Sequence, residues 1–564
     1  MDYPLIECVP NFSEGRDSAV IRQIADQIES VEGVRLLNVD SGKATNRTVM
    51  TFVGEPEAVC EAAFRAARKA AELIDMRRHR GEHPRFGAID VLPLVPIRGI
   101  TMEETSALAV ELGRRIGEQL GIPVYLYEKS ATREERRNLA NVRQGEYEGL
   151  KDKMRHEEWR PDFGPAEFNE RSGAVAVGAR DFLVAYNINL NTTSTRRANA
   201  IAFDIREKGR IKRLGNPLTG ETVRDEFGEP VWEPGSLKAV KAIGWYIEEY
   251  GIAQVSMNLT DIKQTPIHVA FEEAVERAAQ RGIRVTGSEL VGLVPLEAIL
   301  EAGRHFLRKQ KRSLGVPNEE LIKIAVKSLG LDDLRPFDPH EKIIEYAMAR
   351  GDDVRRLVDR TVKGFVWEIA SESVAPGGGS VAALAGALAA ALGTMVANLS
   401  AHKRGWDDRW EEFSNWAVQG KTQVERLLRL IDEDTDAFNA LVAAYNLPKD
   451  TDQEKEHRSG QIQEATKNAA SVPLLVMRET VKAMETVKAM AEIGNPASAS
   501  DAGVGILCAR AAVLGAGLNV QTNCSSIQDS AFVEKVLKEA EELTRLACAI
   551  EVDVLATVQA KFKK

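Results

Sequence analysis

The stretch VAALAGALAAALGTMVANL, residues 381–399, is an uncharged run built mainly from alanine, leucine and glycine. It is nearly long enough to cross a lipid bilayer as a helix. However, it contains Thr394 and Asn398, it lacks the aromatic belt of membrane helices, and its small side chains suit close packing between helices. We therefore expect a tightly packed buried helix here and no membrane span.

Helical periodicity extends from this run over the last part of the chain. Apolar residues recur at three- and four-residue steps in the ranges 354–370, 406–432, 465–491, 499–518 and 531–561. Regular strand signals are missing from this part of the sequence. We therefore predict an all-α domain over residues 353–564.

The first 330 residues have a different pattern, in which β-rich runs alternate with amphipathic helices. This alternation predicts α/β layers. Strands are expected at 5–10, 34–40, 49–54, 88–96, 124–127, 174–177, 182–188 and 253–258. Strand-type sequence resumes near residue 174 after a polar stretch, so we predict two α/β subdomains, 1–180 and 181–330. Two prolines in LDDLRPFDP (331–339) indicate a linker over 331–352. The predicted fold class is multidomain, with two α/β subdomains followed by an all-α domain.

Length, charge and cysteine usage narrow the class of protein. The chain has 564 residues, a formal net charge of −10 and 44% hydrophobic residues. A chain this long can bury several cores without disulfides or structural metals, and its acidity argues against a general nucleic-acid binder. Five scattered cysteines without a CxxC pair are typical of reduced thiols in a cytoplasmic protein. The first residues carry acids and no apolar segment, so we expect no signal peptide.

The segment HRGEHPR, residues 79–85, is the densest group of chemically useful side chains. Its spacing His79-x-x-Glu82-His83 matches a zinc-peptidase pattern, which requires one unbroken helix. Gly81 and Pro84 interrupt such a helix, so we expect no metal site. Two interpretations remain: a polar surface loop, or a catalytic imidazole at His83 placed just before a strand.

Polar residues also gather where the predicted strand 34–40 ends and leads into the next one. Strand ends commonly line the clefts of α/β proteins. Asp40, Asn46 and Arg47 are therefore candidate substrate contacts. The alternative is a solvated turn stabilised by its Asp and Asn side chains.

In the helical domain, the sequence PGGGS (376–380) precedes the alanine-rich helix. It lacks the lysine of a phosphate-binding Walker loop. Its backbone N–H groups, including that of Gly378, can still face a carboxylate or phosphate, with Ser380 as the N-cap. The alternative is a tight turn followed by an ordinary cap.

The predicted helix 424–445 carries an acid within its apolar stripe. Asp434 lies in the middle of this stripe, whereas Asp432 and Asp436 project from the opposite side and are expected to be solvated. A carboxylate on a buried face needs a partner or a raised pKa, so Asp434 is either a functional group or a structural hydrogen-bonding residue. Farther on, GNPASASD (494–501) breaks two helices and could bring Asn495 and Asp501 toward the same cavity.

Several longer motifs resemble a known family. ECVPNFSEGR (7–16), TNRT (45–48), GEHPRFGAIDVLP (81–93), NINL (187–190), QVSMNLTD (254–261) and GSELVGLVPLEAI (287–299) resemble glutamate formimidoyltransferases. APGGGSVAA (375–383) and LIDEDTDAF (430–438) resemble formimidoyltetrahydrofolate cyclodeaminases. Their order resembles that of the bifunctional formimidoyltransferase-cyclodeaminase family, and the similarity covers essentially the whole chain.

The resemblance implies two linked reactions of histidine degradation and one-carbon metabolism. A formimidoyl group passes from N-formimidoyl-L-glutamate to tetrahydrofolate, and 5-formimidoyltetrahydrofolate is then cyclised to 5,10-methenyltetrahydrofolate with release of ammonia. It also implies tetrahydrofolate as a co-substrate, polyglutamylated in its natural form, and no metal. From the apolar helices we expect a homo-oligomer through the helical domain, in the cytoplasm. The alternatives are folate-dependent formyl transfer to or from glutamate on the same fold, and a non-catalytic helical scaffold.

The resemblance also assigns residues. His83 corresponds to the transferase base, Asp434 to the cyclodeaminase acid/base, and Asp40 could stabilise the cationic formimidoyl group. The first segment implied to bind folate is Gly164, Pro165, Ala166, Glu167, Phe168, Asn169, Glu170, Arg171, Ser172 and Gly173. The second is Gly235, Ser236, Leu237, Lys238, Ala239, Val240, Lys241, Ala242, Ile243 and Gly244. The stretch 214–233 is longer than we expect in vertebrate members, and it is either a surface hairpin or a change in how the folate tail is held.

Overall fold

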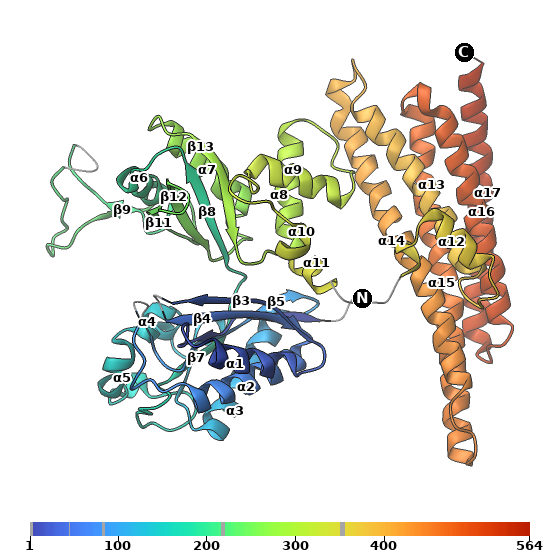
Figure 1. Ribbon diagram of the computed structural model, residues 1–564. Helices are drawn as coiled ribbons and strands as arrows, with labels where there is room; N and C mark the ends of the chain where they lie inside the picture. Colours follow the sequence, from blue (N-terminus) through green and yellow to red (C-terminus); the bar gives the residue numbers. More distant parts are fainter. Residues whose placement is uncertain (1–3, 44–45, 82–84, 216–219, 350–355, 564) are drawn as a thin grey trace. The chain divides into compact units, whose positions relative to one another are not determined.

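The computed structural model describes residues 4–43, 46–81, 85–215, 220–349 and 356–563. The chain forms two compact units. The first, here called the α/β unit, comprises residues 1–299 and 329–351, and the second, the helical unit, comprises residues 300–328 and 352–564. The predicted order of sheet-containing regions followed by a helical region is confirmed (Figure 1).

The N-terminal part of the α/β unit is built on a seven-stranded mixed sheet. Its order is β1-β4-β2-β5-β7-β6, with β3 paired to β4. The strands are β1 (Leu5–Cys8), β2 (Asn11–Phe12), β3 (Val34–Gly42), β4 (Arg47–Gly54), β5 (Ile89–Arg98), β6 (Val124–Leu126) and β7 (Val175–Ala179). Three amphipathic helices bury their apolar sides on one face of this sheet: α1 (Ser18–Glu29), α2 (Pro56–Leu73) and α3 (Met102–Leu120).

The opposite face of this sheet is covered only in part. The short helices α4 (Leu139–Arg143) and α5 (Glu146–Lys153) pack through Val142 and Leu150 against Tyr125 and Phe86. Because side chains alternate along a strand, Met50 and Phe52 of β4 point to the helices, whereas Arg47 points to this second face. The second face is therefore where polar side chains of the sheet collect.

The second part of the α/β unit is a four-stranded antiparallel sheet in the order β11-β12-β8-β13. Its strands are β8 (Val184–Leu190), β11 (Val240–Ile247), β12 (Ile252–Leu259) and β13 (Val285–Val291). Helices α6 (Thr195–Ile205) and α7 (Ile267–Ala279) pack on one face. The strands β11 and β13 were not predicted, because exposed charges and glycines dilute their apolar alternation. At Gly244 of β11 a Cβ atom would overlap the backbone of α6, so glycine allows this close contact.

The long stretch 214–233 belongs to an extended hairpin based on the strand pair β9 (Arg210–Ile211) and β10 (Trp232–Glu233). Isolated bridges between Arg213 and Thr222 and between Arg224 and Pro230 continue the pairing. The structure does not describe residues 216–219 of this stretch. The predicted linker 331–352 also holds structure, because α10 (Pro339–Lys342) and α11 (Ile344–Ala349) lie within it.

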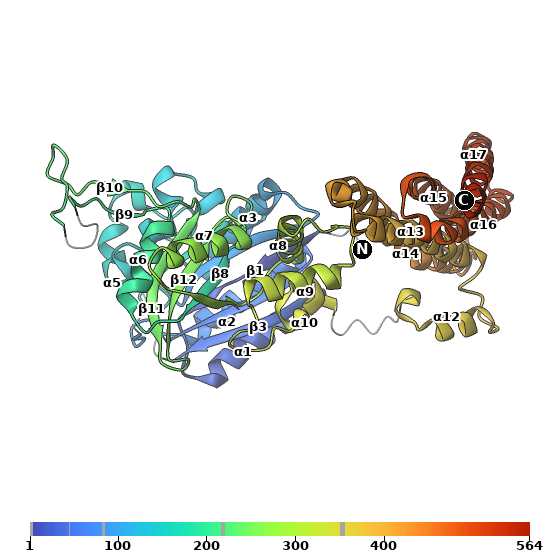
Figure 2. The same ribbon diagram turned by 90° about the horizontal axis from the view of Figure 1, so that it is seen from above.

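The helical unit is dominated by five long helices (Figure 2). They are α13 (Gly378–Ala401), α14 (Trp410–Tyr445), α15 (Asp452–Ile493), α16 (Ala499–Cys524) and α17 (Ser530–Phe562), preceded by α12 (Val362–Ile369). The unit also includes most of α8 (Leu296–Lys309) and α9 (Asn318–Leu329). Small residues bring the helices together: a Cβ atom at Gly386 of α13 would lie 2.5 Å from Oγ1 of Thr480.

Two segments, α13 and Pro496–Cys524, are long and apolar enough to cross a membrane by length and composition alone. In the structure, 61% and 50% of their most apolar windows are buried. The core helices of a helical bundle meet the same criterion, so these two segments are weak evidence for a membrane span.

Candidate functional site

A buried carboxylate lies at the centre of a charged cluster on the second face of the seven-stranded sheet. Between β2 and β5 the pairing shifts by one residue, which leaves Asp90 as the extra residue of a β-bulge. Asp90 is 1% exposed and forms ion pairs with Arg47, at 3.3 Å, and with Arg143. Two guanidinium groups therefore meet at one buried carboxylate, and guanidinium groups are well suited to bind anionic groups.

Arg47 belongs to the cluster as the sequence predicted. Burial lowers its pKa to about 10, against the opposing effect of the Asp90 carboxylate, so Arg47 remains cationic at neutral pH. Its Nε donates to Oδ1 of Asn11 at 3.3 Å. Asn11, Asp90 and Arg143 were not among the predicted site residues, although Asn11 and Asp90 lie inside the quoted motifs.

Asn46 and His79 form a second group beside this cluster. Asn46 has a φ of 50°, a conformation that Asn adopts more readily than most residues. Its Oδ1 accepts from the N–H of Gly15 at 3.0 Å, and its Nδ2 donates to the carbonyl of Arg80 at 2.9 Å. Nε2 of His79 lies 2.7 Å from the carbonyl of Asn46, so this nitrogen must carry the proton.

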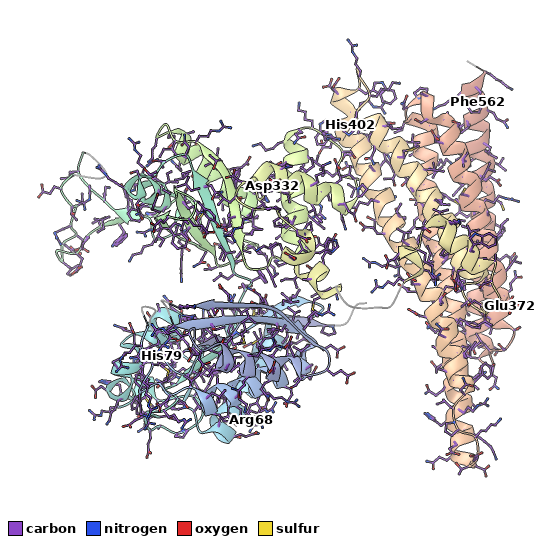
Figure 3. The ribbon with its side chains drawn as sticks, viewed as in Figure 1. Arg68, His79, Asp332, Glu372, His402 and Phe562 are labelled. Atoms are coloured by element: carbon purple, nitrogen blue, oxygen red, sulfur yellow. The ribbon has the colours of Figure 1, made fainter. Side chains whose placement is uncertain are left out.

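This hydrogen bond fixes which ring nitrogen of His79 carries the proton (His79 is labelled in Figure 3). Its Nδ1 is then the unprotonated nitrogen, and this atom is buried without a partner in the described residues. Burial lowers the pKa of His79, so the ring is neutral at pH 7. His79 is therefore a positioned hydrogen-bond acceptor and not a cation.

His83 lies outside the described residues, together with Glu82 and Pro84. The described neighbours on both sides of it join the same group. The carbonyl of Arg80 accepts from Asn46, and Arg85 is buried, with Nη1 donating to the carbonyl of His79 at 2.8 Å. Asp40 is exposed on β3 and pairs with Val49, the residue that also pairs with Asn11. Asp40 thus lies on the same face of the sheet as the cluster.

The four-stranded sheet carries a polar network on the face away from α6. Asn189 and Gln254 are buried there, and Nε2 of Gln254 donates to Oδ1 of Asn189 at 2.8 Å. Asn189 also donates to Asp333 at 3.0 Å, and Trp245 donates to Gln254 at 3.1 Å. Buried amides in a sheet face need such partners. None of these side chains was predicted as a site residue, although NINL and QVSMNLTD contain two of them.

The two segments implied to bind folate line different cavities. Ala166, Glu167, Phe168 and Glu170 line a cavity of about 650 Å³ together with basic residues, namely Lys151, Arg155 and Arg160. Gly235 and Ser236 line another of about 310 Å³ with Arg210 and Arg277. From Val240 onward the second segment forms strand β11, on which Lys241 is exposed. Burial raises the pKa of the half-buried Glu128, and the nearby charge of Lys241 partly opposes this rise.

In the helical unit, Asp434 of α14 meets the first turn of α13. Its Oδ2 accepts from Oγ of Ser380 at 2.9 Å. A Cβ atom at Gly379 would overlap the Asp434 carboxylate, so only glycine permits this approach. Burial raises the pKa of Asp434, against the opposing hydrogen bonds from the side chain and backbone of Ser380. Asp434 is therefore a partly buried acid that holds its proton more tightly than an exposed aspartate.

The neighbouring acids differ from each other. Asp436 is exposed, as predicted. Asp432 was predicted to be solvated, which is wrong: it is half-buried and accepts from the N–H of Leu357 at 2.7 Å, and burial raises its pKa. Leu357 belongs to a short segment before α12, and the helical period alone gives no sign of this contact. The amide of Asn519 lies beside Gly378 and was not predicted.

Asp501 lies at the other end of α13. The N–H of Asn495 donates to Oγ of Ser400 at 2.8 Å, and Asp501 follows in the first turn of α16. Twenty residues of α13 separate Ser400 from Ser380, about 30 Å along the helix. The structure therefore brings Ser380 to Asp434, together with Gly379, the chain neighbour of the predicted Gly378. It does not bring Asp501 there. Among the described residues, no three His, Cys, Asp or Glu side chains are grouped to hold a metal ion.

Family models match most of the chain. The formiminotransferase domain, N-terminal subdomain, matches residues 5–180, the formiminotransferase domain matches 185–349, and formiminotransferase-cyclodeaminase matches 361–542. The formimidoyltransferase-cyclodeaminase of Gallus gallus is 44% identical over 97% of this chain and 98% of its own length. The chain belongs to the formimidoyltransferase-cyclodeaminase family. The α/β unit corresponds mainly to the two formiminotransferase models, and the long helices correspond mainly to the formiminotransferase-cyclodeaminase model.

Relatives of single parts match as well. The glutamate formimidoyltransferase of Thermoplasma acidophilum is 43% identical over 54% of this chain and 92% of its own length. A protein of Methylorubrum extorquens named methenyltetrahydrofolate cyclohydrolase is 38% identical over 36% of this chain and 98% of its own length. Each part of this chain is thus similar to a shorter protein that contains that part alone.

Proposed function

We propose that this chain is a bifunctional folate enzyme. Its α/β unit transfers the formimidoyl group from N-formimidoyl-L-glutamate to tetrahydrofolate. Its helical unit cyclises the resulting 5-formimidoyltetrahydrofolate to 5,10-methenyltetrahydrofolate and releases ammonia. The observation that carries the proposal is the relation of this chain, along nearly its full length, to formimidoyltransferase-cyclodeaminases. A separate polar cluster in each compact unit supports it, around Asp90 in the α/β unit and around Asp434 in the helical unit.

In the transfer step, the folate N5 amine attacks the amidine carbon and must lose a proton as the new bond forms. His83 is proposed as the group that takes this proton and returns one to the departing glutamate nitrogen. Asp40 would stabilise the cationic formimidoyl group. The guanidinium groups of Arg47 and Arg143, which Asp90 holds together, would bind a carboxylate of the glutamate donor.

In the cyclisation step, N10 of the folate attacks the formimidoyl carbon, and the nitrogen that leaves as ammonia needs a proton. Asp434 is proposed to accept the first proton and supply the second. Its raised pKa helps here, because an acid that keeps its proton closer to neutral pH can also donate it. Ser380 would hold the carboxylate in one orientation through its 2.9 Å hydrogen bond.

The folate is proposed to be polyglutamylated, with its tail held by the basic cavity beside Phe168 while the reacting head visits both sites. Neither step requires a metal ion. If 5-formimidoyltetrahydrofolate accumulates fully in solution before any methenyl product forms, the tethering is wrong.

The chain is also proposed to form a homo-oligomer in the cytoplasm. Side chains of α13 and α16 leave an exposed apolar surface, here called the α13–α16 face: Val381, Leu388, Leu399, Val504, Leu507 and Leu518. Exposed apolar surfaces of this kind commonly mark contacts between proteins. Free cysteines, all five of them, fit a reducing compartment.

Reciprocal variants test the two activities. His83→Ala should abolish formimidoyl transfer but retain cyclodeamination of supplied 5-formimidoyltetrahydrofolate, and Asp434→Ala should do the reverse. Methenyltetrahydrofolate is followed by its absorbance and ammonia by a coupled assay. Loss of both activities in either variant, with the fold intact by circular dichroism, would show a single shared site and overturn the proposal.

Two alternatives are tested with the same preparations. A formyl donor lacks the amidinium charge, so competition between N-formyl- and N-formimidoyl-glutamate distinguishes the two donors. The relative named methenyltetrahydrofolate cyclohydrolase favours a second candidate for the helical unit, namely addition of water to the methenyl carbon. Methenyltetrahydrofolate that is added to the enzyme should persist. Its rapid loss, with no ammonia consumed or released, would favour the hydrolase.

A further inference from the structure

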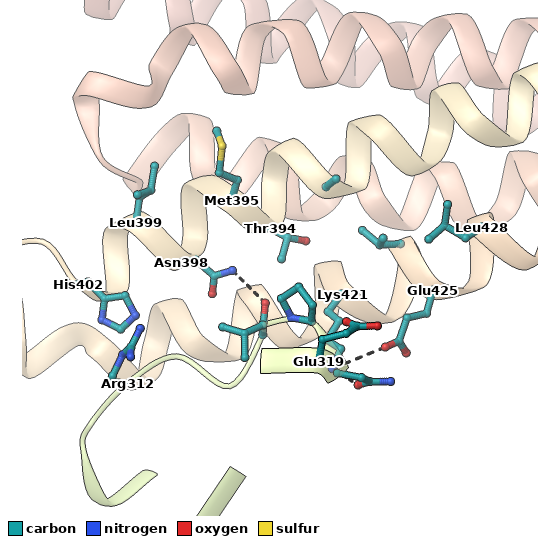
Figure 4. Close-up of a pocket in the computed structure, with 16 residues that line it drawn as sticks. Arg312, Glu319, Thr394, Met395, Asn398, Leu399, His402, Lys421, Glu425 and Leu428 are labelled. Carbon is teal, nitrogen blue, oxygen red and sulfur yellow. Dashed lines mark hydrogen bonds and ion pairs between the residues drawn. The ribbon is translucent and has the colours of Figure 1, made fainter. Parts of the chain in front are cut away.

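A cavity of about 640 Å³ lies in the helical unit, and none of the residues proposed to act in transfer or cyclisation lines it. Its walls come from α13, from α14 and from the α8–α9 segment, residues 310–319 (Figure 4). This volume is in the range of small-molecule sites. The cavity is not part of the proposed cyclodeaminase cluster, because Leu428 at its edge precedes Asp434 by six residues, about 9 Å along α14.

The α8–α9 segment is fixed against the two helices. The N–H of Leu314 donates to Oγ of Ser414 at 3.0 Å, and Gly315 packs so closely on Ala417 that a Cβ atom would overlap it. The wall of the cavity is therefore held by hydrogen bonding and packing within the helical unit. A preformed wall lowers the entropy that a ligand must lose when it binds.

The middle of the cavity is apolar. Six apolar side chains line it: Val316, Pro317, Met395, Leu399, Val424 and Leu428. A flat or linear hydrocarbon group fits such walls, and methionine adapts to the shape of a ring. The cavity thus favours a ligand with an apolar body.

Asn398 adds one hydrogen-bonding requirement. Its Nδ2 donates to the carbonyl of Gly315 at 2.9 Å, which fixes the orientation of the amide (Figure 4). Oδ1 is then an acceptor, and it is buried with no partner among the described residues. Buried acceptors are rarely left unpaired. A ligand with an N–H group next to its apolar body would satisfy this atom.

The two ends of the cavity differ in charge. At one end, Lys421 is already paired, with Asn318 at 2.8 Å and Glu425 at 3.6 Å. At the other end Arg312 lies beside His402 (Figure 4), and no ion pair ties Arg312 to a carboxylate in the part of the chain that the structure describes. The guanidinium of Arg312 is therefore available for an anionic group on a ligand.

We propose that this cavity binds an N-aroyl amino acid, with its ring on the apolar walls, its amide N–H on Oδ1 of Asn398 and its carboxylate on Arg312. This chemistry has two sources: the benzoyl-glutamate part of a folate, or a free N-acyl amino acid. The first source rests on the function proposed above, whereas the cavity itself does not.

Isothermal titration of the full chain tests the site with 4-aminobenzoyl-glutamate, with benzoyl-glycine and with the neutral amide of benzoyl-glycine. The two acids should bind, and the neutral amide should bind about tenfold more weakly. Arg312→Ala and Asn398→Ala should each remove about tenfold of the affinity for the acids. Arg308→Ala, an exposed arginine of α8 that does not line the cavity, should change it by no more than about twofold.

Hydrogen exchange of the same samples locates the binding. Residues 312–319 and 391–402 should be protected by the acids in the native chain and not in Arg312→Ala. Binding of 4-aminobenzoyl-glutamate alone indicates a folate tail, and binding of benzoyl-glycine with equal affinity indicates a free acid. Absence of binding at millimolar concentration, or binding that both variants retain, overturns the proposal. Because the titration is repeated in Asp434→Ala, failure of the cyclodeaminase assignment is distinguished from failure of the site.

Discussion

Single buried charges set much of the chemistry of the α/β unit. Asp90 is paired with two arginines, but Glu7 of β1 is not neutralised to the same degree. Burial raises the pKa of Glu7 from 4.5 to about 7, with only partial compensation by Arg180. A group with a raised folded-state pKa binds its proton more tightly in the native protein than in the unfolded chain. Stability of the α/β unit therefore depends on the pH near neutrality.

Glu7→Gln is expected to remove this dependence. In the native protein, the free energy of unfolding should fall as the pH rises between about 4.5 and 7, by up to about 3 kcal/mol, because the unfolded chain ionises first. Urea unfolding from pH 4 to 9 measures the effect. Glu29→Gln, an exposed acid of α1, should retain the native pH dependence. If the free energy of unfolding depends on pH in the same way in the native protein and in Glu7→Gln, Glu7 is not the source of the pH dependence.

His79→Phe tests the group that surrounds Asn46. The variant loses the hydrogen bond from Nε2 to the Asn46 carbonyl, so formimidoyl transfer should fall by about tenfold in kcat/KM. Cyclodeamination of supplied intermediate should stay unchanged. His156→Ala, an exposed histidine of the same unit, is the matched control. If transfer is unaffected while the fold is intact, His79 has no positioning role.

These residues also show how far sequence reasoning reaches. Asp434 could be singled out because a carboxylate in an apolar stripe is unusual, and the structure places it, partly buried, against Ser380. Asp90 could not, because its position follows from a shift in strand pairing that no local pattern reveals. Asn189 and Gln254 meet only when β8 and β12 pair.

The close approach of α14 to the start of α13 determines the geometry of the proposed cyclodeaminase cluster, Asp434 and Ser380. Gly379→Ala should displace the Asp434 carboxylate without altering its chemistry, because the added Cβ atom would overlap it. We expect cyclodeamination to fall by about a hundredfold, as for a misplaced catalytic group, while transfer is retained. Ammonia release from supplied 5-formimidoyltetrahydrofolate is the measurement.

Gly377→Ala is the control for this variant. No atom lies within 4 Å of a Cβ placed there, so its activity should stay within about twofold of the native value. Equal losses of cyclodeaminase activity in both variants would mean that any side chain added in this loop lowers the activity, whether or not it touches Asp434. Thermal unfolding of both variants checks that α13 still forms.

The long helices were predicted more completely than the strands. The predicted helices from residue 380 onward correspond to α13–α17. The predictions 406–432 and 424–445 together cover α14, whereas α15 begins 13 residues before its predicted start at residue 465. Their apolar periodicity persists over many turns, so a few polar positions do not hide it. The strands β11 and β13 are interrupted by glycine. Tertiary contacts with α6 and with Leu329, not local preference, hold them in place.

At the scale of the whole molecule, the apolar α13–α16 face predicts self-association. Leu388 is 51% exposed and Leu507 is 49% exposed, and an arginine at either position would put a charge into a contact made by this face. The double variant Leu388→Arg/Leu507→Arg should therefore have a lower molar mass in light scattering than the native protein. Phe227→Arg, in the hairpin of the α/β unit, should not change the mass. An unchanged mass in the double variant would place the contact elsewhere.

The path of the chain has a practical consequence for dissecting the enzyme. It passes between the two units three times, after residues 299, 328 and 351. A protease nick in the 350–355 region therefore leaves residues 300–328 on the upstream fragment while they remain seated on α13 and α14 of the downstream one. The nicked halves should co-migrate under native conditions and part only in denaturant. A recombinant fragment that starts at residue 356 would lack residues 310–319, which form one wall of the cavity beside α13 and α14.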